Sequence, residues 1–407
     1  MSFNTVAAPD QARPDLRRYF YCFKFVELAP YVYQPYSIAI VSEDGEQEFS
    51  VLIAEGLEKA SADIRSQVEG NALIMSRDQI KNYLLGKFVK PAKKVEFWSF
   101  QDIYYRHMFA ELFGGIDRNS NILFRQTGVE HLLHRDMQHL YVGMGKPLHV
   151  IGQQPPENKF DALRTAKWGL WAFKQFRDFS QDHPVSSVPI TENPENLCRL
   201  FHDWEYWRKE DGVIFPLSVG LISQDGKTML HGIFREYVEE FMTKDPVHYN
   251  EHEVFIARKV IPKIMKDHQA IWGKSAEIAE GIIDMIPEID LLELWSDHDV
   301  HDRYLVGATQ TSEGWGIISE LRHRKKVRAV LARDTVHAQV HLGWPAGQPA
   351  QMLDTTHHGL GDARHNREIF NYLQTYARQN GIQADPIIPD DFKRSVSSVP
   401  LPQPLLQ

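Results

Sequence analysis

Two stretches of the chain carry one pattern: Pro35-Tyr-Ser-Ile-Ala-Ile-Val-Ser-Glu-Asp-Gly45 and Pro216-Leu-Ser-Val-Gly-Leu-Ile-Ser-Gln-Asp-Gly226. They lie 181 residues apart (226 − 45). In each, an apolar run ends at an Asp-Gly pair, and a second run follows at 48–53 or 228–234. Two such runs around an Asp-Gly turn predict an antiparallel hairpin. We therefore expect the chain to build the same kind of sheet twice.

Two further matches extend this register along the chain. Glu96-Phe-Trp-Ser99 resembles Glu293-Leu-Trp-Ser296, and Phe160-Asp-Ala-Leu-Arg-Thr165 aligns with His357-His-Gly-Leu-Gly-Asp362. Both pairs are 197 residues apart (293 − 96 and 362 − 165), so the copies differ by one length change of 16 residues (197 − 181). A repeat of this length indicates two domains in tandem rather than a solenoid of short units.

Segments containing Pro and Ser mark the ends of the two copies. Pro184-Val-Ser-Ser-Val-Pro189 follows the first copy, and Ser395-Val-Ser-Ser-Val-Pro400 follows the second. Such composition is typical of connecting segments. We expect an N-terminal extension at 1–18, a first domain at 19–180, a linker at 181–197, a second domain at 198–386 and a tail at 387–407.

The composition is that of a soluble globular protein. The 407 residues are 43% hydrophobic and 24% charged, with a net charge of −9. This charge argues against a protein that coats nucleic acid non-specifically, but not against a local basic groove. The two cysteines cannot form a disulfide framework, and we see no signal peptide or membrane-spanning segment. We expect a cytoplasmic protein that does not enter a membrane.

The coarse secondary structure indicates the fold class. After each hairpin come helical patterns, at 64–85 in the first copy and at 253–265 and 275–285 in the second. A short apolar strand follows, at 96–100 or 291–295, and then a helix from Asp102 or His301. The apolar spacing over 360–377 predicts a last helix. The expected fold is α/β, with two tandem domains, each a mixed sheet with antiparallel first strands and helices on its faces.

Only the second copy contains residues that could together bind metal ions and move a proton. Asp203 and Glu205 are two residues apart on a strand and therefore share a face. Asp302 lies in the helix after the short strand, and His357 and Asp362 bracket the start of the last helix. Carboxylates from separate elements suit Mg²⁺ or Mn²⁺, and a histidine beside them can take a proton from water. The alternative is a set of surface acids and helix caps.

The choice of Asp302 has local competitors. Acidic and imidazole groups surround it in the sequence, namely Asp297, His298, Asp299 and His301. The order and spacing of the complete set, together with the registering first copy, favour the functional interpretation.

The second copy resembles the DEDD exonucleases of the ribonuclease H-like fold, in their histidine-bearing branch. The resemblance is greatest to small bacterial 3′–5′ exoribonucleases of the RNase AS type. The segments that carry it are Asp203-Trp-Glu205, Phe255-Ile-Ala-Arg-Lys-Val-Ile-Pro262, Trp272-Gly-Lys-Ser-Ala-Glu-Ile, Glu293-Leu-Trp-Ser and Gly361-Asp-Ala-Arg-His-Asn-Arg-Glu.

This resemblance implies a set of roles. Two Mg²⁺ (or Mn²⁺) ions would be held by metal ligands Asp203, Glu205, Asp302 and Asp362, with His357 as general base. Two positions depart from the family pattern and are expected to contact substrate. Trp204 is bulkier than the usual Thr, and His358 replaces the usual Asp or Asn, so either histidine is a candidate base. The spacing of five residues before Asp362 favours His357.

The first copy lacks this set of side chains. In register order, Asp203, Glu205, Asp302, His357 and Asp362 are replaced by Cys22, Lys24, Tyr105, Phe160 and Thr165. None of the five replaces a metal-binding carboxylate, and Lys24 would repel a cation. We therefore expect a degenerate exonuclease-like domain that acts as a scaffold, with substrate capture as the alternative. Because enzymes of the resembling family are homodimers, the tandem is expected to be an intramolecular pseudo-dimer, which leaves a higher oligomer open.

The expected function is a 3′–5′ exonuclease that acts on the 3′ end of single-stranded RNA and releases nucleoside monophosphates. Two alternatives are retained. One is an exonuclease for DNA or short oligonucleotides, and the other is a non-catalytic module that binds nucleic acid or a protein partner.

Overall fold

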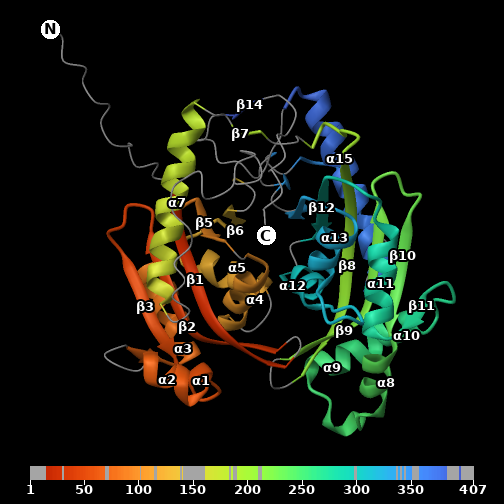
Figure 1. Cartoon of the computed structure of the whole chain (residues 1–407), viewed down its shortest axis with the longest axis horizontal. Helices are drawn as coiled ribbons and strands as arrows, with labels where there is room; N and C mark the ends of the chain where they lie inside the picture. Colours follow the sequence, from red (N-terminus) through yellow and green to blue (C-terminus); the bar gives the residue numbers. More distant parts are fainter. Residues whose placement is uncertain are drawn as a thin grey trace. The chain divides into compact units, whose positions relative to one another are not determined.

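The structure is a computed structural model of the whole chain (Figure 1). It describes residues 15–29, 32–68, 73–100, 102–113, 117–137, 140, 161–182, 185–186, 190–209, 213–297, 300–335, 338–339, 342, 345–350, 357–382 and 394–395. No helix within these ranges is both long enough and apolar enough to cross a membrane.

The chain divides into two compact units. Unit 1 comprises Met1–Phe25, Pro35–Asp136 and Pro155–Trp171, and unit 2 comprises Val26–Gln34, Met137–Gln154 and Ala172–Gln407. Each copy of the repeat thus centres on its own unit. The segment Val26–Gln34, which the repeat register places in the first domain, is grouped with unit 2.

The sheet of the second copy has six strands in mixed orientation. In spatial order they are β11 (Ile271–Gly273), β10 (Met229–Phe234), β9 (Ile214–Ser223), β8 (Leu197–Arg208), β12 (Leu291–Ser296) and β13 (Ala329–Asp334). The first three strands along the chain, β8, β9 and β10, pair antiparallel, and β12 and β13 join them in parallel.

Helices cover both faces of this sheet. On one face, α15 packs on β8 and β9, and on the other, Ile278 of α11 lies against Gly232 of β10. A further apolar cluster joins Trp207 and Ile233 to the segments α8, η4 and α10. The helical segments are α8 (Arg235–Thr243), the 3₁₀ turn η3 (Pro246–His248), α9 (Glu251–Phe255), the π-helix η4 (Ile256–Val260), α10 (Ile261–Ile264), α11 (Ser275–Met285), α12 (Val300–Ala308), α13 (Ile317–Arg324) and α15 (Gly359–Gln379).

The sheet of the first copy has the same connectivity. Its strands, in spatial order, are β4 (Ile74–Met75), β3 (Glu48–Ile53), β2 (Val32–Ser42), β1 (Leu16–Ala29), β5 (Lys94–Ser99) and β6 (His131–Asp136). Its helical segments are α1 (Ala54–Leu57), α2 (Ala62–Val68), α3 (Arg77–Tyr83), the π-helix η1 (Leu84–Phe88), α4 (Asp102–Leu112), α5 (Asp117–Gln126) and α7 (Ala162–Asp182). The prediction of two tandem α/β domains with mixed sheets is confirmed.

The structure differs from two expectations for the first copy. The expected single helix over 64–85 is interrupted by β4, because Ser76 starts a new helix. The Ser76 hydroxyl accepts a hydrogen bond from the Gln79 N–H, and the Gln79 side chain accepts one from the Ser76 N–H, which is a capping box. The first strand also begins at Leu16, inside the segment expected to be an extension.

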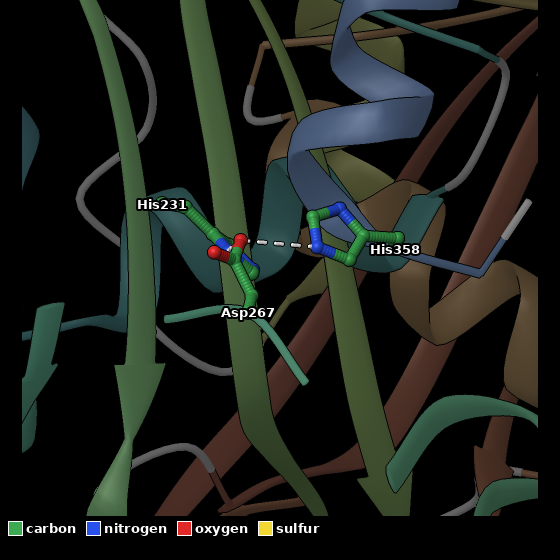
Figure 2. Close-up of side chains that lie close together, drawn as sticks. All are labelled: His231, Asp267 and His358. Carbon is green, nitrogen blue, oxygen red and sulfur yellow. Dashed lines mark hydrogen bonds and ion pairs between the residues drawn. The ribbon is translucent and has the colours of Figure 1, made fainter. Parts of the chain in front are cut away.

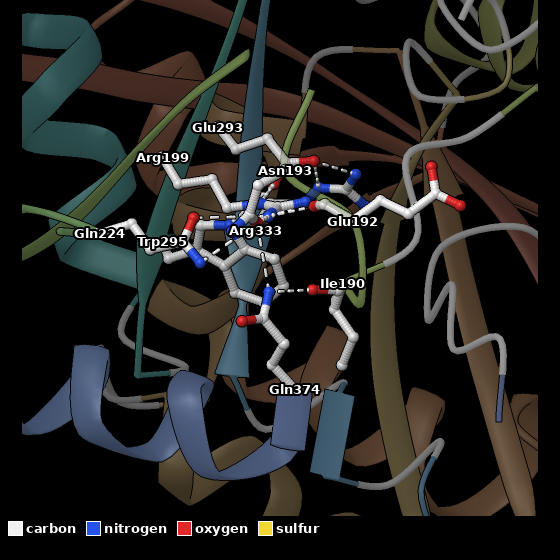
Figure 3. A network of polar contacts seen from close by, with 9 residues as sticks. All are labelled: Ile190, Glu192, Asn193, Arg199, Gln224, Glu293, Trp295, Arg333 and Gln374. Atoms are coloured by element: carbon white, nitrogen blue, oxygen red, sulfur yellow. Dashed lines mark hydrogen bonds and ion pairs between the residues drawn. The ribbon is translucent and has the colours of Figure 1, made fainter. Parts of the chain in front are cut away.

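Each sheet contains a buried glutamate between two arginines. In the second copy, Glu293 accepts hydrogen bonds from Arg199 at 2.7 Å, from Arg333 Nε at 3.0 Å and from the indole of Trp295 at 3.1 Å (Figure 3). Arg199 also donates to the carbonyl oxygen of Glu192, which holds the segment before β8. Burial alone would raise the pKa of Glu293, but the two guanidinium groups lower it to about 2. The carboxylate therefore stays charged in the core.

The first copy repeats this arrangement. Glu96 accepts hydrogen bonds from Arg18 at 3.0 Å, from Arg135 at 3.1 Å and from the Trp98 indole at 3.1 Å. Because Glu96 and Glu293 occupy the same position in the repeat, the ion network is part of the duplicated fold.

The two repeated tail segments also meet. The short strands β7 (Val185–Ser186) and β14 (Arg394–Ser395) pair in parallel and form a two-stranded sheet. Segments that the sequence suggests are plain connectors therefore contribute backbone hydrogen bonds to unit 2.

Candidate active site

Strand β8 presents the first two carboxylates. Asp203 and Glu205 are half-buried and point to the same face of the sheet, whereas Trp204 between them points to the opposite face. A β-bulge directly after Glu205 locally changes the pairing with β9, a feature that is frequent next to active sites. Trp204 is only 3% exposed and stacks on Phe234 with ring centroids 5.6 Å apart. The ring belongs to the core, so the expected contact of Trp204 with substrate has no support in the geometry.

The start of α15 brings a third carboxylate, that of Asp362, to the two carboxylates on β8. A Cβ atom on Gly220 of β9 would lie 2.1 Å from the backbone nitrogen of Leu360 and 2.2 Å from the carbonyl carbon of Gly359. The helix can approach the sheet this closely only because neither Gly220 nor Gly359 has a side chain. Asp362, in the first turn of α15, therefore lies beside the strand.

Asp203, Glu205 and Asp362 form a group that suits a metal ion. One ligand oxygen from each lies within 4.8 Å of the others. Burial raises the pKa of Asp362 to about 6, and the negative charge of Asp297 also raises it, whereas hydrogen bonds from the backbone of His358 and His357 lower it. Carboxylates held this close favour a shared cation, and hard divalent ions prefer oxygen ligands.

Asp302 lies next to this group without being one of its three members. It is 1% exposed on α12, and its Oδ1 accepts a hydrogen bond from the Trp204 N–H at 3.1 Å. Trp204 lies between Asp203 and Glu205 in the strand, so this bond places Asp302 directly beside these two residues.

The contacts of the two neighbouring histidines differ. His358 caps α15 with Nδ1, which accepts the Gly361 N–H at 3.2 Å, while its Nε2 lies 3.1 Å from Asp267 Oδ2. Both ring nitrogens of His358 are thus engaged within the protein, so its expected contact with substrate has no support in the geometry. His357 instead packs its ring edge-on against Phe255, with centroids 4.8 Å apart. This division favours His357 as the proton acceptor.

The surroundings of His357 include three residues to which the sequence alone assigns no role. Phe255 is 39% exposed, and Lys259 and Lys263 follow it on the next helical turns. Burial lowers the pKa of His357, and the positive charges of Lys263 and then Lys259 lower it further. The signal that could have pointed to the lysines is their spacing of four residues, which places both on one side of a helix.

The corresponding positions of the first copy contain no comparable group of acids. The thiol of Cys22 is fully buried, 3.3 Å from the hydroxyl of Tyr105. Burial raises the pKa of Cys22, whereas the charge of Lys24 and hydrogen bonds from Tyr105 and Thr165 lower it. Lys24 is half-buried on β1, and Phe160 lies outside the described residues. Among the described residues, every group of three potential metal ligands lies in unit 2.

The chain was compared with known proteins. No family model matches it, and neither does any curated protein. Solved structures similar to it include E. coli Exonuclease I in complex with a 5cy-dA13 oligonucleotide, at 10% identity over 58% of this chain and 61% of that chain, with a TM-score of 0.28. A moderately thermophilic Exonuclease I from Methylocaldum szegediense is similar at 9% identity over 89% and 99%, with a TM-score of 0.30.

The matched region spans less than two thirds of the E. coli chain. Likeness at this level carries no information about which bond this protein acts on. Its function has to follow from its own side chains.

Proposed function

We propose that the second copy is a metal-dependent 3′–5′ exonuclease that removes nucleoside monophosphates from single-stranded nucleic acid, with RNA preferred. The convergence of Asp203, Glu205 and Asp362 beside His357 is the observation that supports this proposal. The preference for RNA and the 3′–5′ direction rest on the resemblance of the sequence to RNase AS-type enzymes.

The carboxylates would hold the metal. The three grouped side chains are the proposed ligands, and Asp302 is the fourth, since its bond to the Trp204 backbone keeps it beside them. Two Mg²⁺ or Mn²⁺ ions, when bound, would stabilise the attacking and leaving oxygens of an in-line displacement at phosphorus. Positive charge at this position favours the ionised form of Asp362 and so opposes the rise in its pKa caused by burial.

His357 would take the proton from the attacking water. Its lowered pKa keeps the ring neutral at neutral pH, which a general base requires. Phe255 supports the ring, and Lys259 and Lys263 supply positive charge near it. The same lysines would attract the phosphates of the substrate strand.

The first copy is proposed to be a scaffold without its own chemistry. The buried contact between Cys22 and Tyr105 supports this, because a thiol and a phenol in a closed core are poor ligands for Mg²⁺. The arrangement as an intramolecular pseudo-dimer is proposed from the tandem repeat. The cytoplasmic location is proposed from the two cysteines, Cys22 and Cys198, which are both free.

A competition assay tests the proposed function. The full chain is incubated with 5′-labelled single-stranded RNA and DNA of one sequence, with EDTA or with Mg²⁺ or Mn²⁺. We expect stepwise shortening from the 3′ end, faster for RNA, that EDTA stops. Asp203→Asn should abolish it, whereas the exposed control Asp225→Asn should not.

The other outcomes point to the alternatives. Faster shortening of DNA would replace RNA by DNA as the substrate. Binding of either strand without turnover in Mg²⁺ or Mn²⁺ would support a binding module and refute the exonuclease. Normal cleavage by Asp203→Asn would refute the assignment of the site.

A further inference from the structure

A second group of side chains comprises His231, Asp267 and His358 (Figure 2). His358 directly follows the proposed base, His357. His231 Nδ1 is 2.5 Å from Asp267 Oδ2, and His358 Nε2 is 3.1 Å from the same oxygen. The three residues come from β10, from the loop before β11 and from the position just before α15. One carboxylate oxygen thus connects the sheet to the start of α15.

The other contacts of the two rings fix where their protons are. His358 Nδ1 accepts the Gly361 N–H, so the neutral ring carries its proton on Nε2 and donates it to Asp267. His231 donates from Nδ1, because its Nε2 is buried with no hydrogen-bond partner among the described residues, and a proton there would be unsatisfied. The second oxygen of Asp267 accepts the Gln269 N–H at 2.8 Å. Asp267 therefore works as a double acceptor for two neutral imidazoles.

Two imidazoles and a carboxylate are also the ligands of many zinc sites. A metal bound to Nε2 of His358 would need the lone pair on that nitrogen and would move the ring proton to Nδ1. That proton would point at the Gly361 N–H and break the helix cap. The cap therefore argues for a hydrogen-bonded group and against a metal site.

The first copy has the cap without this connection. Asp161 occupies the repeat position of His358, and its Oδ1 accepts the Arg164 N–H at 2.8 Å at the start of α7. Ser50 occupies the position of His231, since Ser50 pairs with Ala39 as His231 pairs with Gly220. An ordinary carboxylate cap is enough to start the helix there. In the second copy, an imidazole caps the helix and also reaches the sheet through Asp267.

The residue next to the cap is under backbone strain. His357 has φ +59°, in the left-handed region that few residues other than glycine adopt. Such conformations persist where the surrounding structure holds them, and they cluster at active sites. His358 fixes the chain on one side of His357, and Asp362 follows in the first helical turn.

We propose that His231, Asp267 and His358 form a latch that fixes the start of α15 and so positions His357 and Asp362 for the reaction. The three are positioning residues, because the polar contacts of their side chains are with one another and with nearby backbone N–H groups. The catalytic meaning of the latch rests on the proposed exonuclease function, whereas its effect on the helix and on metal binding does not.

The test uses the full chain with Asp267→Ala, His358→Asn and a matched control, Asp225→Ala. Asp225 also accepts a backbone N–H two residues ahead, from Lys227 at 3.1 Å, but on an exposed hairpin turn. For each variant we would measure amide hydrogen exchange in the first turn of α15, affinity for Mn²⁺ by titration calorimetry, and kcat and KM on labelled RNA.

Asp267→Ala is expected to speed up exchange at the start of α15 and to weaken Mn²⁺ binding about 10-fold, as loss of a residue that supports a metal ligand does. The value of kcat should fall about 10²-fold while KM changes little, because the reacting groups are misplaced rather than lost. His358→Asn keeps a capping side chain but loses the contact with Asp267, so exchange should speed up and kcat should fall as in Asp267→Ala. Asp225→Ala should match the wild type.

Three results would overturn the latch. The first is Asp267→Ala behaving like Asp225→Ala in exchange and Mn²⁺ affinity. The second is full kcat in His358→Asn. The third is one equivalent of Zn²⁺ bound by the wild type and lost in Asp267→Ala, which would show a metal site. A wild type that cleaves no nucleic acid refutes the exonuclease proposal, while exchange and Mn²⁺ affinity still decide whether the latch exists.

Discussion

The two copies share a buried ion network and differ where the last helix meets the hairpin. Glu96 and Glu293 each lie between two arginines in the same register. At the meeting point, Gly220 and Gly359 of the second copy correspond to Ala39 and Ala162 of the first. The network serves folding, and removal of one member would take away a buried counter-charge. The close approach of α15 places Asp362 beside the strand, so the comparison separates a feature that both folds share from one that the proposed chemistry uses.

The largest effect is expected at the paired positions Asp362 and Thr165. Asp362→Asn removes a proposed metal ligand, and a loss of several kcal/mol of transition-state stabilisation corresponds to a fall in kcat of about 10³-fold or more. Thr165→Ala should leave the rate unchanged. Single-turnover cleavage of labelled RNA measures both. An active Asp362→Asn, or an inactive but folded Thr165→Ala, would remove the functional difference between the copies.

The ion network should matter for stability in both copies. Glu96→Gln and Glu293→Gln each remove the carboxylate that two buried arginines share, which should cost up to about 3–5 kcal/mol. Arg18 keeps its ion pair with Glu43 at 3.1 Å, so the smaller loss is expected for Glu96→Gln. Urea unfolding followed by tryptophan fluorescence measures the loss, with the exposed Glu240→Gln as control. If Glu293→Gln is no less stable than Glu240→Gln, the network has no structural role.

The same network gives a pH dependence of stability. The pKa of Glu293 is about 2 in the folded chain and about 4.3 in an unfolded one. Its contribution to stability is therefore fully present above about pH 4.3 and disappears as the pH falls toward 2. Glu293→Gln should remove this part of the acid sensitivity.

A substitution at Gly220 tests the close approach of α15 to β9, and its expected effect on the rate is smaller than that of Asp362→Asn. In Gly220→Ala the new methyl group would collide with the backbone of Gly359 and Leu360, so α15 must move away from β9. A displacement of about 1 Å at reacting groups costs about 10²-fold in rate. The reverse change in the first copy, Ala39→Gly, should not alter the rate. If Gly220→Ala and Ala39→Gly both keep the activity of the wild type, the close approach of the helix is not what positions Asp362.

The smallest expected effect concerns the pH profile. Burial and two lysines lower the pKa of His357, so the base stays neutral and the rate stays constant to a pH below the usual histidine value of about 6.5. Lys263→Gln removes one of these charges and should move the acid limb of kcat to higher pH, by less than about one unit. No movement, or movement to lower pH, would contradict the role of His357 as base.

At several single residues the structure departs from what the sequence pattern predicts. The apolar periodicity over 64–85 indicates one helix, yet Ser76 and Gln79 form a capping box that starts a second one. Trp204 looks like a stacking platform from its place between two acids, but strand alternation turns it into the core. His358 and His357 are indistinguishable as bases in sequence, and only their contacts separate them.

The sequence alone determined the duplication, the mixed α/β class and the positions at which the copies differ, because these depend on local periodicity and on a constant offset. Only the tertiary structure decided which side chains meet. Asp267 reaches His231 and His358 from 36 and 91 residues away, and no local spacing predicts that meeting. The proximity of Asp362 to Asp203 likewise depends on two glycines from different elements, because the approach of two backbones is set by packing rather than by the order of residues along the chain.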